Sequence, residues 1–310
     1  MSDQYLCDKS GVQGREIQDL EELLGQFRHR SPIKRPPVWQ MPRRGWWLPA
    51  AAALAVCSVA IPLSLRGPVS DWRYTAGKNE AIQVRTGQTL DSGKSTATLE
   101  SRLTGELQIK PNSRLRLVAS GDRQQRFELE QGTIHALIWA PPGKFVVDTP
   151  VARTIDLGCR YTLQMSKSGE GVLSVDIGWV AFEWQGVESF IPAGASSKTN
   201  PKKGPGTPWF TDAFPELQSA LVAFDAGQGS LESALRNARV RDAITVWHLM
   251  TRSKGEAPSQ AYDVLAELTP LPAEAGREAI LAGKSEAIYA AWDALGLGSA
   301  EIWRTWKRSW

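Results

Sequence analysis

The sequence predicts a protein of mixed class: one transmembrane helix, then an all-β sandwich or roll, then an all-α C-terminal region. Three observations predict this order. Residues 46–65 contain no charged side chain. Between residues 81 and 191, apolar residues recur at every second position, which is typical of β-strands. After residue 208 they recur at every third or fourth position, which is typical of helices.

The composition is that of an ordinary globular protein. Of the 310 residues, 42% are apolar and 22% are charged, and the net charge of +3 is too small to indicate a nucleic-acid partner. The three cysteines, Cys7, Cys57 and Cys159, are too widely spaced for a metal site or a disulfide framework. We therefore expect no metal, no cofactor and no nucleic acid.

Catalytic motifs are absent from the sequence. It contains no GxSxG, no HExxH, no P-loop, and no GxGxxG followed by an acidic residue. The adjacent carboxylates Glu21 and Glu22 lie on a short predicted helix with no pocket. We therefore expect no enzymatic activity and no catalytic residue.

The uncharged stretch from Trp46 to Leu65 would span roughly 30 Å as a helix, the thickness of a bilayer core. The residues before it are basic without an acid among them, which places the N-terminus in the cytoplasm by the positive-inside rule. These basic residues are Arg28, Arg30, Lys34, Arg35, Arg43 and Arg44. Alternatives are a buried core helix, a cleaved signal peptide, or a lipoprotein signal ending at Cys57. We expect a cytoplasmic tail (1–45), a single-pass transmembrane helix (46–66) and a linker (67–80).

The tail contains one amphipathic segment. Acidic residues crowd its first turns and basic residues its end, in agreement with the helix dipole. The short tail offers no other segment against which its apolar stripe could pack, so this stripe is our candidate partner-binding surface. The alternative is a helix on the inner membrane surface, or one that frays. The stripe consists of Ile17, Leu20, Leu23, Leu24 and Phe27.

Residues 81–195 predict a domain of short strands. Leu107 and Ile109 alternate before a turn at Pro111–Asn112, and the alternation resumes after it. The alternating apolar positions after the turn are Leu115, Leu117, Phe127 and Leu129. Gly, Pro and Asn occur between these short strands at regular intervals, which favours a sandwich or roll.

Residues 155–165 raise the question whether Cys159 is a nucleophile. The pattern predicts one strand, in which Cys159 faces the core and Asp156 faces solvent, so that the two cannot act as a pair. We therefore interpret Cys159 as a core residue rather than a reactive thiol. The alternation changes phase near Gly178, which predicts a bulge or turn there.

The order and spacing of several motifs across residues 81–195 resemble the FecR domain family. Leu129 and Gly132 match its L-x-x-G hairpin, and residues 145–150 match its F-x-V-x-T-P element. Leu157, Gly158 and Tyr161 match L-G-T-x-F, with Cys159 in place of the usual Thr.

This resemblance implies a single-pass regulator of the bacterial inner membrane. Its β domain would be periplasmic and would relay a signal, through protein contacts, to an extracytoplasmic-function sigma factor bound by the cytoplasmic tail. On the periplasmic side the partner would be an unidentified envelope protein or polymer. The alternative is an envelope protein that binds cell-wall polymer or another protein without signalling.

The remainder of the chain predicts a second linker and a helical region. Residues 196–208 are rich in Pro, Gly, Ser and Lys, as exposed linkers are. Residues 209–310 predict five to seven short helices packed as hairpins. Like the β domain, this region is expected in the periplasm.

Overall fold

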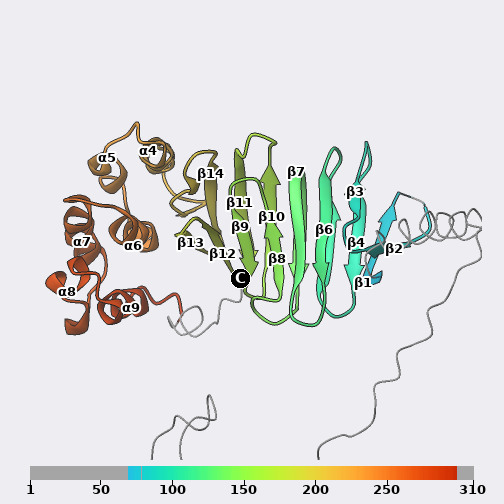
Figure 1. Ribbon diagram of the computed structural model, residues 1–310. Helices are drawn as coiled ribbons and strands as arrows, with labels where there is room; N and C mark the ends of the chain where they lie inside the picture. Colours follow the sequence, from blue (N-terminus) through green and yellow to red (C-terminus); the bar gives the residue numbers. More distant parts are fainter. Residues whose placement is uncertain (1–68, 78, 299–310) are drawn as a thin grey trace, which may run out of the picture. The chain divides into compact units, whose positions relative to one another are not determined.

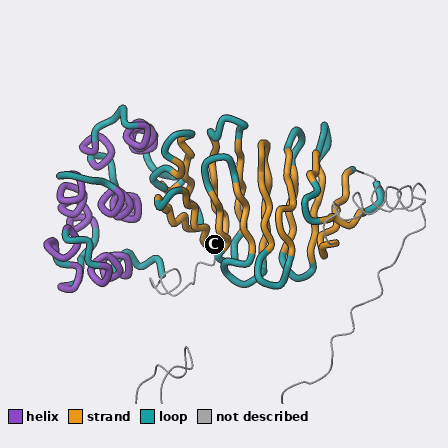
Figure 2. Tube along the Cα trace, in the orientation of Figure 1, coloured by secondary structure: helices purple, strands orange, loops and turns teal. Residues whose placement is uncertain are grey.

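The computed structural model describes residues 69–77 and 79–298 (Figures 1 and 2). Mostly antiparallel β-strands come first and helices follow, which confirms the predicted order of these two regions. The predicted transmembrane segment (46–66) and the tail stripe lie outside these residues. None of the helices formed by the described residues is long and apolar enough to cross a membrane.

The strands form two sheets that share one long strand, β7. In spatial order, the first sheet contains β2 (Ile82–Arg85), β1 (Val69–Ala76), β4 (Ala97–Ser101), β5 (Gly105–Ile109), β7 (Gln125–Ile138), β10 (Arg160–Met165), β11 (Gly171–Ile177) and β14 (Ala195–Asn200), with β15 (Gly204–Pro205) and β16 (Trp209–Phe210) along its edge. The second contains β3 (Thr89–Asp91), β6 (Arg114–Ser120), β7, β8 (Phe145–Asp148), β9 (Arg153–Asp156), β12 (Trp179–Trp184) and β13 (Val187–Pro192).

Strand β7 changes sheets at Gly132. Its first half pairs with β6 and β8, and its second half pairs with β5 and β10. Gly132 has a φ of +105°, and a Cβ atom there would overlap Ser113. The buried Ser113 hydroxyl instead accepts a hydrogen bond from the Thr133 amide at 2.9 Å. Only glycine combines this backbone conformation with this close approach.

The chain crosses between the sheets eight times within the described residues, and every crossing contains a residue with positive φ. These residues are Gly87, Gly93, Asn112, Gly132, Gly143, Gly158, Gly178 and Gly194. The turn expected at Pro111–Asn112 and the turn expected at Gly178 are both confirmed. Because the chain returns to each sheet several times, consecutive segments of sequence contribute to both sheets.

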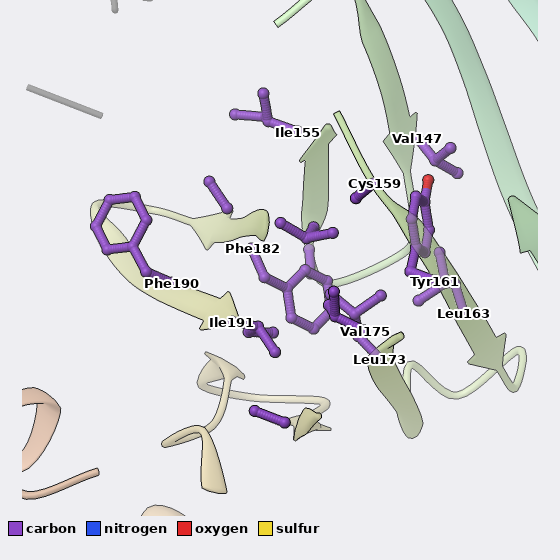
Figure 3. Close-up of a cluster of buried hydrophobic side chains, with 14 of the residues drawn as sticks. Val147, Ile155, Cys159, Tyr161, Leu163, Leu173, Val175, Phe182, Phe190 and Ile191 are labelled. Atoms are coloured by element: carbon purple, nitrogen blue, oxygen red, sulfur yellow. The ribbon is translucent and has the colours of Figure 1, made fainter. Parts of the chain in front are cut away.

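Side chains from both sheets meet in one hydrophobic core. Figure 3 shows Tyr161, Leu163, Leu173 and Val175 of the first sheet beside Val147 and Phe182 of the second. The predicted core residues of β5, β6 and β7 are fully buried, which confirms the alternation in this part of the sequence. They are Leu107, Ile109, Leu115, Leu117, Phe127 and Leu129.

The linker expected at 67–80 is wrong, because β1 occupies most of it. Trp72 is fully buried and lies edge-on to Phe127, with ring centroids 5.1 Å apart. Its indole N–H donates to the Gln125 side chain at 3.0 Å. Trp72 and Tyr74 occupy alternate positions of β1, so the β region begins at Val69 rather than at residue 81.

The exposed linker expected at 196–208 is also wrong. Strand β14 covers Ala195–Asn200, and Ser196, Ser197 and Thr199 are buried. Their hydroxyls find partners inside the protein: the Ser197 hydroxyl donates to the Gly206 carbonyl oxygen at 2.8 Å. Small polar residues that are satisfied internally pack as core residues do, although their composition is that of a linker.

The single strand expected at 155–165 is two strands in different sheets. β9 ends at Asp156 and pairs with β8 and β12, whereas β10 starts at Arg160 and pairs with β7 and β11. The turn between them includes Gly158, with a φ of +87°. The apolar alternation continues across this turn in sequence, but it does not correspond to one face of one strand.

The helical region begins after β16 and follows the expectation of five to seven short helices. Within residues 209–298 the helices are α4 (Pro215–Ala226), α5 (Leu231–Leu235), α6 (Ala243–Arg252), α7 (Ala257–Leu268), α8 (Arg277–Leu281) and α9 (Ser285–Asp293), with short 3₁₀ turns η1 (Val240–Asp242) and η2 (Ala273–Ala275). Every residue of α6 from Ala243 to Met250 is buried. A helix that is buried on all sides is the centre of its region.

Substitution of Gly178 by Ala should destabilise the fold strongly. Gly178 has a φ of +76°, and a Cβ atom there would overlap the carbonyl oxygen of Gly158 in the neighbouring crossing. The matched control is Gly186→Ala, since Gly186 has a φ of +80° but no atom within 4 Å of the added Cβ. Left-handed backbone alone should cost Gly186→Ala about 1–2 kcal/mol, and overpacking should add about 1–3 kcal/mol in Gly178→Ala. Urea unfolding measures both; equal losses would contradict the clash.

Candidate functional site: a basic groove beside the helix joint

Aromatic side chains join the helices to the second sheet. The Trp292 ring of α9 lies 5.6 Å from the Trp179 ring of β12 and 5.7 Å from the Phe190 ring of β13, measured between centroids. The Trp247 ring of α6 lies edge-on to Trp292 at 4.9 Å. Trp292 is almost fully buried by these contacts. Aromatic pairs of this kind contribute about 0.5–1.5 kcal/mol each beyond the area that they bury.

His248 of α6 adds a directional contact to this joint. Its Nε2 accepts a hydrogen bond from the Phe190 amide at 3.0 Å, and its Nδ1 lies 2.8 Å from the Ile244 carbonyl oxygen. Because an amide can only donate, the Nε2 atom is unprotonated and the Nδ1–H donates to Ile244. Burial lowers the pKa of His248 to about 3, and the charge of Arg252 contributes. The imidazole is therefore neutral at physiological pH.

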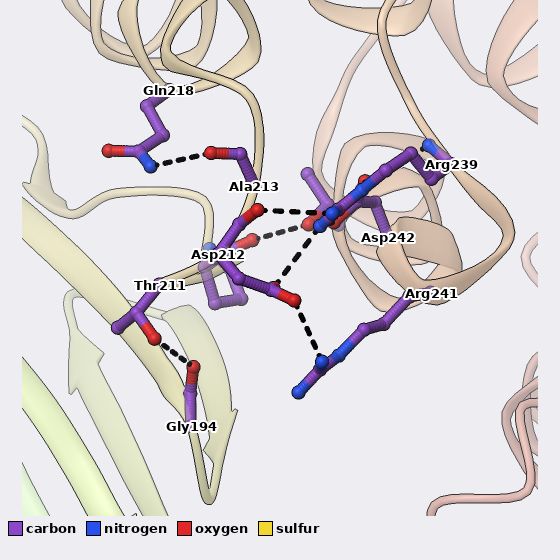
Figure 4. Close-up of polar contacts among 10 residues, drawn as sticks. Gly194, Thr211, Asp212, Ala213, Gln218, Arg239, Arg241 and Asp242 are labelled. Atoms are coloured by element: carbon purple, nitrogen blue, oxygen red, sulfur yellow. Dashed lines mark hydrogen bonds and ion pairs between the residues drawn. The ribbon is translucent and has the colours of Figure 1, made fainter.

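A second joint lies at Asp212, just after β16 (Figure 4). Arg241 donates to its carboxylate at 2.8 Å, and Arg239 donates to both its carbonyl and its carboxylate oxygens at 3.0 and 3.2 Å. Arg239 also donates to the buried Asp242 at 2.7 Å. One exposed acid thus holds the start of the helical region against the strand edge.

Arg252, the last residue of α6, reaches back to the strands. Its two terminal nitrogens donate to the Ser189 hydroxyl at 2.8 Å and to the Pro205 carbonyl oxygen at 2.6 Å. Both partners are neutral oxygens. Burial lowers the pKa of Arg252, and the nearby charge of Asp225 partly opposes this. A guanidinium stays charged even when its pKa falls, so Arg252 places a positive charge between α6 and the strands.

Asp225 of α4 is the acid beside this cation. Its carboxylate accepts hydrogen bonds from the Thr207 amide at 2.6 Å and from the Thr207 hydroxyl at 2.8 Å. Burial raises the pKa of Asp225, while the bonds to Thr207 and the charge of Arg252 act in the opposite direction. The segment after β15 is therefore held between α4 and α6.

A groove of about 960 Å³ opens at this place. The turn between β12 and β13, the turn between β14 and β15, α4 and the end of α6 form its walls. Trp184 and Phe224 supply apolar surface. Four basic side chains line the groove against one acidic side chain, Asp225, so its charge favours an anionic occupant. The basic residues are Lys202, Lys203, Arg252 and Lys254.

None of the groove residues was predicted as a site. Lys202 and Lys203 stand together in the sequence, but their surroundings resembled a linker. Arg252 and Lys254 lie about fifty residues later, and nothing local connects the two pairs. The predicted stripe of the tail, with Leu20 and Leu24 at its centre, lies outside the residues that the structure describes. Within those residues, no cluster of three or more His, Cys, Asp or Glu side chains is suited to hold a metal ion.

The buried Cys159 has a partner that the sequence analysis excluded. Its thiol donates a hydrogen bond to the Asp156 carboxylate, and both side chains are buried. The expectation that they face opposite ways is wrong, because the Gly158 turn separates their strands and the Gly158 amide donates to Asp156 at 2.7 Å. Burial raises the pKa of the Asp156 carboxyl to about 7. Burial also raises the pKa of the Cys159 thiol, and the charge of Asp156 raises it further. This environment disfavours a reactive thiolate.

Comparisons of this chain with known proteins find little similarity. The sequence matches no protein-family model, and it matches no curated protein. Two solved structures of a presumed anti-sigma factor from Parabacteroides distasonis ATCC 8503, at 2.50 and 1.65 Å resolution, are similar to it at 13% identity and a TM-score of 0.36. They cover 47% and 48% of this chain, and 74% and 75% of their own. A TM-score of 0.36 is too low to establish a common fold.

Replacing His248 by a residue that does not titrate should make the free energy of unfolding depend less on pH in the acid range. The folded imidazole has a pKa of about 3, whereas the unfolded one has a pKa near 6.5, so stability is present above pH 6.5 and is lost as pH falls toward 3. His248→Gln keeps an acceptor for the Phe190 amide but takes up no proton. We expect the slope of the unfolding free energy between pH 4 and 6 to fall by about 1.4 kcal/mol per pH unit.

The contribution of Asp156 to stability depends on pH in the opposite sense. The pKa of its carboxyl is raised in the folded state, so this contribution falls as pH rises from 3.8 to about 7. The comparison of His248→Gln with the unmodified chain isolates the histidine, since Asp156 is present in both. Equal slopes in the two proteins would show that His248 is already protonated in the fold.

Cys159 should react slowly with iodoacetamide in the native protein and fast in urea, because burial and Asp156 both raise the pKa of its thiol. Mass spectrometry of the Cys159 peptide separates this reaction from that of Cys7 and Cys57. Asp156→Asn removes the charge but not the burial, so labelling should stay slow. Native labelling as fast as in urea would contradict the buried position.

Proposed function

We propose that this chain is a single-pass regulator of the bacterial inner membrane, similar to the FecR family, that relays an envelope signal to a cytoplasmic partner. The expected partner is an extracytoplasmic-function sigma factor, bound by the tail. The observation that carries the proposal is the basic groove, because strands and helices build it together. A partner bound there would contact both regions at once.

The contacts around Arg252 give the groove a means of affecting the fold. The guanidinium lines the groove and also bonds to Ser189 in β13 and to Pro205 in β15. An anionic group that binds Arg252 would compete with these neutral oxygens for its N–H groups. Binding would thereby alter the contact between α6 and the strands, four residues from His248 on the same face of α6.

The sequence supplies the other half of the proposal. The uncharged segment from residue 46 to 65 and its basic flank favour a membrane anchor with the tail in the cytoplasm. The tail stripe has no intramolecular mate on that side. A segment of this kind orders when a partner covers its apolar face, which suits a regulated contact.

The second candidate is an envelope protein that binds an acidic polymer without signalling. Trp184 and basic side chains line the same groove, which favours this candidate, because an indole face and cations together suit an acidic sugar chain. This candidate needs the groove but not the tail. The two candidate functions therefore differ in whether the tail binds a cytoplasmic partner.

The tail variant Leu20→Asp with Leu24→Asp should abolish capture of the sigma factor by the detergent-solubilised full chain. Two charges in the stripe would oppose its burial against a partner. The control Gln18→Asp with Gln26→Asp adds the same charges at polar positions of the predicted helix and should leave capture intact. Co-purification followed by mass spectrometry measures it. If the unmodified chain captures no sigma factor, the regulator proposal fails and the polymer-binding candidate is preferred.

A groove variant tests the relay itself. Lys202→Glu with Lys203→Glu should leave sigma-factor capture intact but remove the response of a sigma-dependent reporter gene in cells. Lys94→Glu with Lys110→Glu makes the same change of charge outside the groove and should respond as the unmodified chain does. A full response from the groove variant would rule out the groove as the receiving site.

A further inference from the structure

Exposed apolar side chains gather at one end of the first sheet. This end, named the entry end here, comprises the start of β1, the β4–β5 turn, the end of β7 and the end of β11. The pairings of Gly105 with Ile138, and of Arg160 with both Leu137 and Ile177, bring these segments together. The start of β1 joins them because the Ser101 hydroxyl donates to the Asp71 carboxylate.

Four large apolar side chains are exposed at the entry end. They form the entry-end patch: Leu103 (78% exposed), Trp139 (54%), Ile177 (51%) and Leu137 (44%). They are half of the large hydrophobic residues exposed among those that the structure describes. Pro141 and Pro142, also exposed, extend the same loop from Trp139. A patch of this kind marks an interaction surface.

Trp139 is held in place rather than loose. Its amide donates to the Thr104 carbonyl oxygen at 3.0 Å, and its indole N–H donates to the Arg102 carbonyl oxygen at 3.0 Å. The indole is thereby fixed beside the β4–β5 turn that carries Leu103. An apolar ring held near polar backbone groups is the arrangement that tryptophan adopts at membrane interfaces.

The length of chain before β1 decides what covers this patch. The predicted transmembrane segment ends at residue 66 and β1 starts at Val69, so the three Cα steps between them reach at most about 10 Å. The end of β7 lies three strands from β1, or roughly 15 Å along the sheet. If residues 46–66 cross the bilayer, the entry end lies against the membrane surface.

We propose that the entry-end patch inserts into the interface of the membrane in which the chain is anchored. This inference rests on the anchor in the proposed function. Charges at this end are mixed, since Arg160 lies 3.5 Å from Asp176 and Asp71 accepts from Ser101. Attachment is therefore through apolar insertion and should resist high salt.

The attachment would orient the rest of the molecule. β12 starts at Trp179, directly after the Gly178 crossing, and ends at Trp184 in the groove. Gly178 follows the end of β11, which belongs to the entry end. The groove therefore lies at the far end of the strands from the membrane, where an envelope partner can reach it.

Quenching by brominated phospholipids tests this placement in the full chain reconstituted into phosphatidylethanolamine–phosphatidylglycerol vesicles. The fluorescence of the unmodified chain minus that of Trp139→Phe isolates Trp139 from the other tryptophans. The matched control is Trp184→Phe, at the far end of the strands. We expect the Trp139 component to be quenched and the Trp184 component to be unaffected. Leu103→Asp with Ile177→Asp changes two exposed positions and should remove most of the Trp139 quenching.

The experiment distinguishes the absence of a membrane anchor from the absence of insertion by the entry-end patch. If the chain does not float with the vesicles, the anchor and with it the proposed function are wrong. If it floats but Trp139 is not quenched by the lipid, only the present inference is overturned, whether Trp139 is then open to aqueous acrylamide or covered by a second copy. Loss of the quenching in 1 M salt would contradict apolar insertion.

Discussion

The bend of β7 at Gly132 is the constraint on which the two-sheet arrangement depends. The strand pairs with β6 and β8 before the bend and with β5 and β10 after it, so one segment of backbone aligns both sheets. The space where a Cβ would stand is filled by Ser113, whose hydroxyl satisfies the Thr133 amide. A side chain at this position would separate the sheets where their cores meet. This one strand therefore pairs with neighbours in both sheets.

The joint between sheet and helices depends on a different principle, the satisfaction of buried polar groups. The Phe190 amide in β13 is buried and donates its hydrogen bond to His248 of α6 at 3.0 Å. Arg252 and Asp225 serve the same purpose around Pro205 and Thr207. A buried donor or acceptor that is left without a partner costs about 1–3 kcal/mol. The helical region therefore has one preferred position, and the groove has defined walls.

The sequence predicted the regions where local pattern and tertiary environment agree. In Leu107–Ile109 and Phe127–Leu129 each apolar residue points to the core, and the alternation was sufficient. At 155–165 the alternation spans a turn, because Gly158 redirects the chain without interrupting the apolar spacing. In β14 hydroxyls replaced apolar residues, and their partners are distant in sequence. The groove unites Lys202 with Arg252 through tertiary structure alone, which no local pattern contains. The tail stripe stays a prediction.

The position of β13 at the edge of the second sheet has a consequence for association between molecules. An edge strand presents unpaired backbone groups to which another strand can add, and proteins with long stacked sheets need caps against such growth. Here α6 takes the Phe190 amide, and α9 covers the Trp179 and Phe190 rings. The helical region thus acts as a terminal cap, of the kind that closes a solenoid. It covers the aromatic end of the strands and occupies part of the edge to which a strand of another molecule would add.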